Sequence, residues 1–214
     1  MAMYPTFIVI DDHPLYRQGI MTLISQELHL ECVGEAGTIS EAIEILGKTT
    51  PKLALVDISL QNQNGLDLVR LIKSEYPDMF ILVISMHEEA LYGERALNAG
   101  ARGFVMKHES PSVLLDAVQK VLAGQIAVSE DLRQRLLESI VVGKQDTDAA
   151  SRLSDRELEV FVLIGKGYGA TEIADDLHIS VKTVNAHRDH IKEKLCLASA
   201  AELRKFAVEW VSKT

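Results

Sequence analysis

The chain has 214 residues, enough for two domains that each bury a core without disulfide or metal staples. Hydrophobic residues make up 47% and charged residues 25%, which is ordinary globular composition and excludes a disordered or fibrous class. The formal net charge is −9; residues 1–150 hold 12 Lys or Arg against 21 Asp or Glu, and residues 151–214 hold 10 against 10. This balance excludes diffuse attraction to nucleic acid, so a contact must come from a local basic patch such as 182–194.

The chain contains two cysteines, Cys32 and Cys196, which are too far apart in sequence for metal-like spacing. We interpret both as reduced packing residues, which predicts a reducing, intracellular compartment. No apolar stretch approaches the roughly 18 residues that a membrane span needs, and no basic region followed by an apolar one begins the chain. The protein is therefore predicted to be cytoplasmic and to have no membrane partner.

Short apolar runs alternate with amphipathic stretches from residue 6 to about residue 125. The runs lie near residues 6–10, 31–36, 53–57, 80–85 and 103–106. Such alternation predicts right-handed crossovers between the strands of a parallel sheet. Pro14 and Pro111 suit the first turns of helices that follow two of the strands. We predict one α/β domain with five strands and five helices over residues 1–125.

The segment after this domain is predicted to connect it to a second one. Residues 129–141 have the period of a short helix with one apolar face, made of Leu132, Leu136, Leu137 and Ile140. Residues 143–150 lose apolar content, which is typical of a linker. We therefore interpret residues 126–150 as a linker with a short helix.

Residues 151–214 have a helical period throughout and no apparent strand. Ser154 with Glu157 and Ser199 with Glu202 have the spacing of capping boxes, which open helices. The predicted helices lie at about residues 155–165, 171–177, 181–195 and 199–211. The second domain is therefore predicted to be an all-α domain of four helices.

Five polar residues share one placement, because each follows an apolar run of the first domain. They are Asp11, Asp12, Asp57, Ser85 and Lys107. Since ligands of a parallel sheet collect outside the carboxyl ends of its strands, we expect these side chains to form one site. Three carboxylates in one crevice repel one another unless a cation offsets them, and oxygen ligands favour a hard ion. The sequence thus predicts a Mg²⁺ site.

The same residues suit phosphoryl chemistry. A carboxylate can attack phosphorus when a metal and hydrogen-bond donors absorb the charge, and Asp57, alone at its strand end, is the best candidate. Lys107 would neutralise one phosphoryl oxygen, and Ser85 would donate a hydrogen bond to another. Adjacent Asp11 and Asp12 point in different directions, so one would ligate the metal directly and the other through water. Each residue alone is more often a helix cap or a solvated loop residue, but their joint placement favours a shared site.

Two segments carry a resemblance to a known family. Residues 8–19 (IVIDDHPLYRQG) and 97–107 (LNAGARGFVMK) resemble signatures of the NarL/FixJ subfamily of bacterial two-component response regulators. The resemblance covers essentially the full chain and implies a flavodoxin-like, doubly wound (βα)5 receiver domain. Such a domain takes a phosphoryl group from a sensor histidine kinase, here onto Asp57.

The resemblance also implies roles for individual residues. Mg²⁺ would be held by Asp12, Asp57 and the backbone carbonyl of Ser59, and Asp11 would act through a water. Ser85 and Phe104 would form a switch, in which the hydroxyl moves to the new phosphate and the aromatic ring turns inward.

Phe104 and Gln61 are two positions of the receiver pattern with an additional interpretation. Phe104 alone also fits as an ordinary core aromatic residue. The family usually has Pro four positions after the acceptor, and this chain has Gln61, which predicts a more mobile loop and leaves the phosphoryl lifetime open.

Residues 170–190 predict two helices joined by a tight bend at 178–180, the span of a helix-turn-helix. The exposed side of the second helix is predicted to carry the DNA contacts Lys182, Thr183, Asn185, Ala186, Asp189 and Lys192. We expect base-edge contacts mainly from Lys182 and Asn185, and phosphate contacts from Thr183 and Lys192. A charged, solvated face is the alternative.

A second resemblance favours the DNA-binding interpretation. Residues 153–195 are similar to the LuxR-type DNA-binding domain, which implies double-stranded promoter DNA as a partner. Ala170 and Thr171 stand where relatives commonly have Asn and Lys, which removes a phosphate contact. His187 lies near the buried face, so we interpret it as a structural residue in preference to a DNA contact.

The last helix has an apolar stripe made of Leu203, Phe206, Ala207 and Trp210, for which core packing is the default explanation. Relatives also use this helix for dimer contacts. Residues such as Lys205, Glu209 and Val211 are therefore predicted at the two-fold interface of a homodimer in the active form.

We interpret the chain as a phosphorylation-activated transcription regulator whose receiver performs chemistry only on itself, so that it is not otherwise an enzyme. One alternative is a Mg²⁺-dependent phosphohydrolase with Asp57 as nucleophile, but Ser59 stands where that class needs an acid/base carboxylate. A second alternative is a transcription regulator that works without phosphate and is controlled by a partner or ligand.

Overall fold

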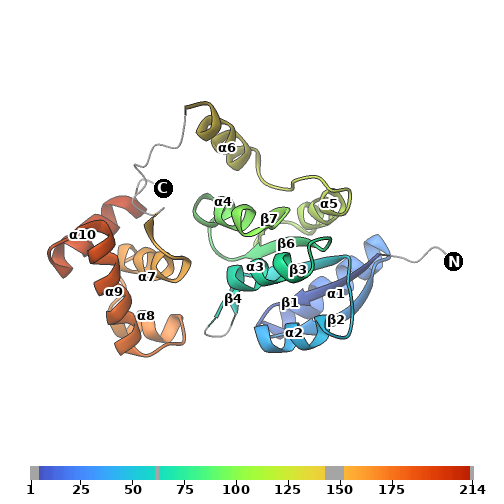
Figure 1. Cartoon of the computed structure of the whole chain (residues 1–214), viewed down its shortest axis with the longest axis horizontal. Helices are drawn as coiled ribbons and strands as arrows, with labels where there is room; N and C mark the ends of the chain where they lie inside the picture. Colours follow the sequence, from blue (N-terminus) through green and yellow to red (C-terminus); the bar gives the residue numbers. More distant parts are fainter. Residues whose placement is uncertain (1–4, 61–62, 143–151, 213–214) are drawn as a thin grey trace. The chain divides into compact units, whose positions relative to one another are not determined.

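The computed structural model describes the backbone of residues 5–60, 63–142 and 152–212 (Figure 1). It describes the side chains of the same residues except 139–142. The chain divides into two compact units, Met1–Glu138 and Ser139–Thr214. No helix in the described ranges is long and apolar enough to cross a membrane. The predicted linker 143–150 lies outside the described residues, so the domain boundaries at 125 and 150 stay predictions.

The first unit is built on a parallel sheet of five strands in the order β2-β1-β3-β6-β7. This order is that of a flavodoxin-like doubly wound sheet and confirms the predicted fold class. The strands are β1 (Thr6–Ile10), β2 (Glu31–Ala36), β3 (Leu53–Asp57), β6 (Phe80–Ser85) and β7 (Gly103–Met106). All five residues of β3, the central strand, are buried, as expected for a strand covered on both faces.

Helices follow the strands and cover the sheet (Figure 1). They are α1 (Pro14–Leu28), α2 (Ile39–Leu46), α3 (Gly65–Glu75), α4 (Glu89–Ala99) and α5 (Pro111–Leu122). Pro14 and Pro111 occupy the first helical turns, as predicted, since their missing N–H groups cost nothing there. Buried residues of α1 and α5 share one core with alternate residues of the strands, so these two helices cover the same face.

A small hairpin, absent from the prediction, interrupts this alternation directly after Asp57. Strands β4 (Ser59–Leu60) and β5 (Gln63–Asn64) pair antiparallel, and Asn64 then caps α3 by accepting a hydrogen bond from Leu66 N at 2.8 Å. Gln61, on which the prediction of a mobile loop rested, lies outside the described residues.

Helix α6 (Glu130–Val142) confirms the short helix predicted at residues 129–141, and its apolar face is only partly buried. Leu132 is only 3% exposed, whereas Leu137 is 58% exposed, so only part of the predicted apolar face is buried. The reason is geometric: five residues span about 500° of a helix, which carries Leu137 well away from Leu132. The side chain of Ile140 lies outside the described residues.

The second unit is helical, as predicted. Its helices are α7 (Asp155–Gly165), α8 (Ala170–Asp176), α9 (Val181–Leu195) and α10 (Ala200–Val211). Ser154 and Glu157 form a complete capping box. At α10 the box is incomplete: Ser199 accepts from Glu202 N, but the Glu202 carboxylate accepts from Ala198 N instead of its cap.

The apolar stripe of α10 packs into the core of this unit. Leu203 and Ala207 are fully buried. The rings of Phe206 and Trp210 lie 6.0 and 5.4 Å from the ring of Phe161 on α7. The default explanation of the stripe, core packing, is therefore confirmed.

Candidate functional site

An acidic cluster lies at the carboxyl ends of three strands of the sheet, β1, β3 and β7. Lys107 Nζ lies 2.7 Å from Asp57 Oδ2 and 2.7 Å from Asp11 Oδ2. The side chains of Lys107, Asp11 and Asp57 are exposed by only 4%, 3% and 2%. The sequence prediction that these three converge is confirmed by the geometry, because parallel strands end at one edge.

Burial dominates the electrostatics of this cluster. It raises the pKa of Asp57 to about 7, and the charge of Asp11 adds to this effect while Lys107 opposes it. Burial would lower the pKa of Lys107, but the charges of Asp57 and Asp11 outweigh it and raise that pKa. One ammonium among these carboxylates leaves a net negative pocket, suited to a cation.

The cluster offers several ligand atoms for a metal ion. Asp11, Asp12, His13 and Asp57 each bring one such atom, and these atoms lie within 4.8 Å of one another. Both Asp11 oxygens are engaged by protein donors, Lys107 Nζ and His13 N. Asp12 Oδ1 is buried and accepts no hydrogen bond from the described residues, although His13 Nδ1 lies 2.7 Å away. A buried carboxylate oxygen that accepts no hydrogen bond from the described residues fits a hard cation.

Two serine hydroxyls, one shortly after β3 and one at the end of β6, meet at His87. Ser59 N donates to Asp57 Oδ1 at 3.2 Å, and Ser59 Oγ lies 2.9 Å from His87 Nε2. Ser85 is completely buried, and its Oγ accepts a hydrogen bond from His87 N at 3.0 Å. His87 therefore touches both hydroxyls, a contact that sequence reasoning missed.

Phe104, the predicted switch residue, is 2% exposed on β7, so its ring is buried in this structure. Its backbone N donates to Ala127 O at 2.9 Å, which ties it to the segment after α5. Burial is compatible with both interpretations of Phe104, the switch and the core aromatic.

Sequence reasoning also missed two residues of α1 that support the cluster. The ring of Tyr16 lies 4.8 Å from Lys107 Nζ, a cation–π contact, and burial followed by the charges of Asp11 and Asp57 raises the pKa of its hydroxyl. Arg17 donates from one guanidinium nitrogen to the backbone oxygen of Asp11 and from Nε to Glu35. Position 16 or 17 on a helix carries no local signal for either contact.

The predicted DNA-contact surface lies on α9. Five of its residues are exposed and Lys192 is partly exposed; the exposed ones are Lys182, Thr183, Asn185, Ala186 and Asp189. Three of the six are engaged locally. Thr183 Oγ1 lies 2.8 Å from the hydroxyl of the helix cap Ser180, and Lys192 Nζ forms a 2.9 Å ion pair with Asp189.

Polar contacts hold α7 against α9 and against the end of α8. Lys194 Nζ donates to Glu157 Oε2 at 2.6 Å, and Glu157 is only 4% exposed. Arg156 reaches the Leu177 carbonyl at the helix-turn-helix bend with a 2.8 Å hydrogen bond. His187 Nδ1 is buried, and burial together with Arg156 lowers the pKa of its ring, in keeping with a structural place.

Comparison with known protein families agrees with both units. Residues 7–119 match the response regulator receiver domain, and residues 151–207 match the luxR family of bacterial regulatory proteins. The transcriptional activator protein ExaE of Pseudomonas putida is 35% identical, with 94% of this chain and 95% of that protein covered. The oxygen regulatory protein NreC of Staphylococcus haemolyticus is 33% identical, with coverages of 94% and 96%.

Solved structures add a three-dimensional likeness. RcsB from Salmonella enterica serovar Typhimurium, bound to promoter rprA in the presence of the phosphomimetic BeF₃⁻, is 27% identical with a TM-score of 0.63 and coverages of 96% and 98%. A structure of two RcsB dimers bound to two parallel DNAs is 27% identical with a TM-score of 0.58 and coverages of 95% and 97%. The chain belongs to the two-component response regulators of the NarL/FixJ type, transcription regulators that join a receiver domain to a LuxR-type DNA-binding domain.

Proposed function

We propose that Asp57 accepts a phosphoryl group from the phosphohistidine of a sensor histidine kinase, and that this modification activates DNA binding. The observation that carries the proposal is the ion pair of Asp57 with Lys107 inside a buried acidic cluster. A carboxylate oxygen of Asp57 attacks phosphorus, the bond from phosphorus to the donor nitrogen breaks, and its electron pair leaves with the imidazole. Lys107 and Ser85 stabilise charge on the transferring oxygens.

Mg²⁺ is the cofactor proposed for this step. Asp12, Asp57 and the backbone carbonyl of Ser59 would hold it, with Asp11 acting through a water. The donor set supports the difference between the two adjacent carboxylates, because Asp11 is occupied by Lys107 and His13 while Asp12 Oδ1 accepts no hydrogen bond from the described residues. When bound, the ion neutralises charge on the phosphoryl oxygens.

The receiver is proposed to act only on its own Asp57. A phosphohydrolase with this nucleophile needs an acid/base carboxylate nearby, and Ser59 stands two residues after Asp57 with its hydroxyl against His87. The proposal places the protein in the cytoplasm, where kinase output and promoter DNA are both accessible.

The second unit is proposed to bind promoter DNA through α9 as a homodimer. Lys182 and Asn185 would contact base edges, Thr183 and Lys192 would contact phosphates, and Ala186 and Asp189 would lie on the same face. Exposure of this face supports the assignment. The dimeric RcsB complexes on DNA support pairing of two copies, here through α10 residues such as Lys205, Glu209 and Val211.

DNA affinity and oligomer size, measured for wild type and Asp57→Asn with and without acetyl phosphate and Mg²⁺, test the proposal. Only wild type with the phosphoryl donor should dimerise and bind promoter DNA more tightly. Equal binding in all four samples would favour the regulator that works without phosphate.

A further inference from the structure

The segment that follows α5 packs against the receiver. Residues up to Glu138, including the first turns of α6, belong to the same compact unit as the sheet. Three kinds of contact attach this segment: a strand-like pairing, a hydrogen bond to α4 and a buried leucine. The first contact is made to Phe104, the predicted switch residue, and the other two are made to Glu89 and Gly93 of α4.

The strand-like contact involves the predicted switch residue directly. Ala127 forms a parallel bridge with Gly103, accepts from Phe104 N at 2.9 Å and donates to Arg102 O at 2.9 Å. A Cβ at Gly103 would stand 2.6 Å from Ala127 O, so only glycine permits this approach. The segment therefore continues the sheet edge next to β7.

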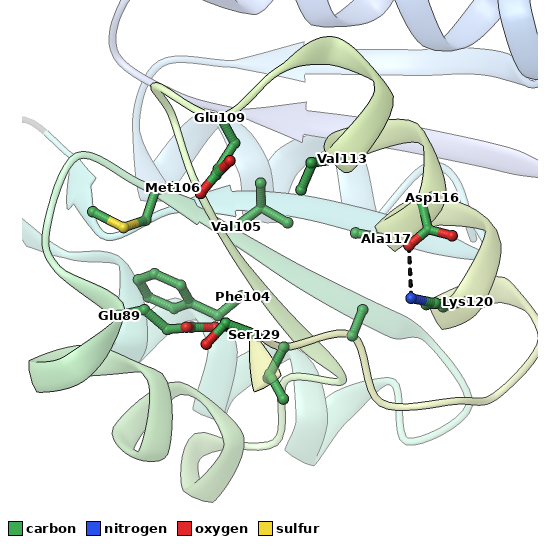
Figure 2. Close-up of a pocket in the computed structure, with 12 residues that line it drawn as sticks. Glu89, Phe104, Val105, Met106, Glu109, Val113, Asp116, Ala117, Lys120 and Ser129 are labelled. Atoms are coloured by element: carbon green, nitrogen blue, oxygen red, sulfur yellow. Dashed lines mark hydrogen bonds and ion pairs between the residues drawn. The ribbon is translucent and has the colours of Figure 1, made fainter. Parts of the chain in front are cut away.

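Helix α4 supplies the other two contacts. Glu89 Oε1 accepts from Ser129 N at 2.9 Å, and Ser129 Oγ in turn accepts from Leu132 N, which caps α6. Figure 2 shows Glu89 and Ser129 beside Phe104, at a pocket of about 120 Å³. Leu132 packs where Gly93 lacks a side chain, since a Cβ there would stand 2.4 Å from Leu132 Cδ2. Glu89 and Gly93 are four residues apart and share one face of α4.

His87, two residues before Glu89, connects the start of α4 to the serine hydroxyls of Ser59 and Ser85. His87 N donates to Ser85 Oγ, and His87 Nε2 lies 2.9 Å from Ser59 Oγ. Its ring lies 4.7 Å from the ring of Tyr92, a fully buried residue of α4 next to Gly93. One residue thus links both hydroxyls near Asp57 to the helix that holds α6.

We propose that His87 relays the state of Asp57 to α4, and that phosphorylation weakens the α4–α6 contact, defined by Glu89–Ser129 and Gly93–Leu132. The inference rests on the proposed function. A phosphoryl group on Asp57 offers strong acceptors to the Ser59 and Ser85 hydroxyls. When these hydroxyls turn toward it, the His87 backbone N–H loses its acceptor Ser85 Oγ, and His87 Nε2 loses its contact with Ser59 Oγ. The first turn of α4 then shifts, and α6 is released to change the reach of the linker.

Hydrogen exchange of the Ser129 and Leu132 amides in the full chain tests this relay. Samples contain Mg²⁺ with or without BeF₃⁻, and ¹⁹F NMR reports whether the phosphomimetic is bound. We expect bound BeF₃⁻ to accelerate exchange of these amides by at least about fivefold, the lower range of allosteric coupling. Unchanged exchange with BeF₃⁻ bound would overturn the relay and leave the proposed function intact. Failure to bind BeF₃⁻ would instead contradict the proposed function, and the relay with it.

Two pairs of variants separate the contact from general destabilisation. Leu132→Ala should give rapid exchange even without BeF₃⁻, whereas Leu137→Ala, at an exposed position of the same helix, should behave as wild type. His87→Ala lacks the ring contacts, so Ser129 should exchange fast already without BeF₃⁻ and should show no further acceleration when BeF₃⁻ binds. Met86→Ala, at a position 64% exposed, should keep the wild-type response. A full response in His87→Ala would overturn the role of His87.

Discussion

Gly65 lies directly against the backbone of Asp57. A Cβ at Gly65 would stand 1.9 Å from the Asp57 carbonyl oxygen and 2.9 Å from Ile58 Cα, and Gly65 N donates to Ile58 O at 2.7 Å. The start of α3 thus packs against the strand end that presents the proposed nucleophile. Because both partners are backbone, no side-chain rotation relieves the clash.

Gly65→Ala is expected to destabilise the receiver by more than about 2 kcal/mol, because the backbone around Asp57 must move. Gly19→Ala is the matched control: nothing lies within 4 Å of a Cβ there, and it should stabilise α1 by about 0.5–1 kcal/mol. Urea unfolding checks both values. Wild-type stability and phosphorylation rate in Gly65→Ala would contradict the close approach.

Metal-free stability should depend on pH through Asp57. Burial raises the pKa of this carboxyl from 3.8 to about 7, so the folded state holds the proton that the unfolded chain releases. Its contribution to stability is therefore full below pH 3.8 and is lost as pH rises toward about 7. Asp57→Asn removes this loss, and added Mg²⁺ offsets it in wild type.

Thermal unfolding in chelator at about pH 5.5 and about pH 8 checks this dependence. Asp57→Asn should unfold at a higher temperature than wild type, by a larger margin at the higher pH. Mg²⁺ should reduce that margin. A difference in unfolding temperature that does not change with pH or metal would show that ionisation of buried Asp57 does not destabilise the folded state.

Acid should weaken the second unit through Glu157. Burial opposes ionisation of this carboxyl, but hydrogen bonds from Lys194 and Ser154 outweigh it and lower its pKa below 4.5. The stabilisation is therefore present above the unfolded pKa and is lost as pH falls through the lower folded value. Glu157→Gln should cost about 1–3 kcal/mol at neutral pH and flatten the acid transition. Glu193 is exposed on α9, so Glu193→Gln should neither lower stability nor flatten the acid transition. Denaturant unfolding of both variants over a pH series checks this.

Asp189 should restrain DNA affinity. Its carboxylate pairs with Lys192 at 2.9 Å, and the hydrogen bond from Lys192 lowers the pKa of Asp189. Asp189→Asn frees that ammonium for a phosphate, so non-specific affinity should rise and the salt slope should steepen by about one. Glu27→Gln makes the same charge change in the receiver and should leave both unchanged. Anisotropy titrations over a salt series decide, and equal effects of the two variants would contradict local neutralisation.

The order of elements was readable from the sequence because local patterns specify it. Buried strands appeared as unbroken apolar runs such as Leu53–Val56, and Ser154 marked the start of α7 through its capping box. The convergence of Asp11, Asp57 and Lys107 followed from strand ends alone.

The remaining features depend on contacts between residues distant in sequence. The ring of Tyr16 under Lys107 and the contact of Ser59 with His87 need coordinates, since neither residue differs locally from a surface residue. The β4–β5 hairpin is only two residues long on each side, too short for a period-2 pattern. The sequence could not tell which part of the apolar face of α6 is buried, because an apolar side chain such as Leu137 can also lie exposed.

The position of the phosphoryl group tests the account most directly. Wild type is incubated with Mg²⁺ and a phosphorylated histidine kinase or acetyl phosphate, and peptide mass mapping locates the modification. The account predicts one phosphoryl group, on Asp57, that requires Mg²⁺ and is absent in Asp57→Asn. A phosphoryl group on another residue, or none on Asp57 under conditions that phosphorylate the kinase, would contradict it.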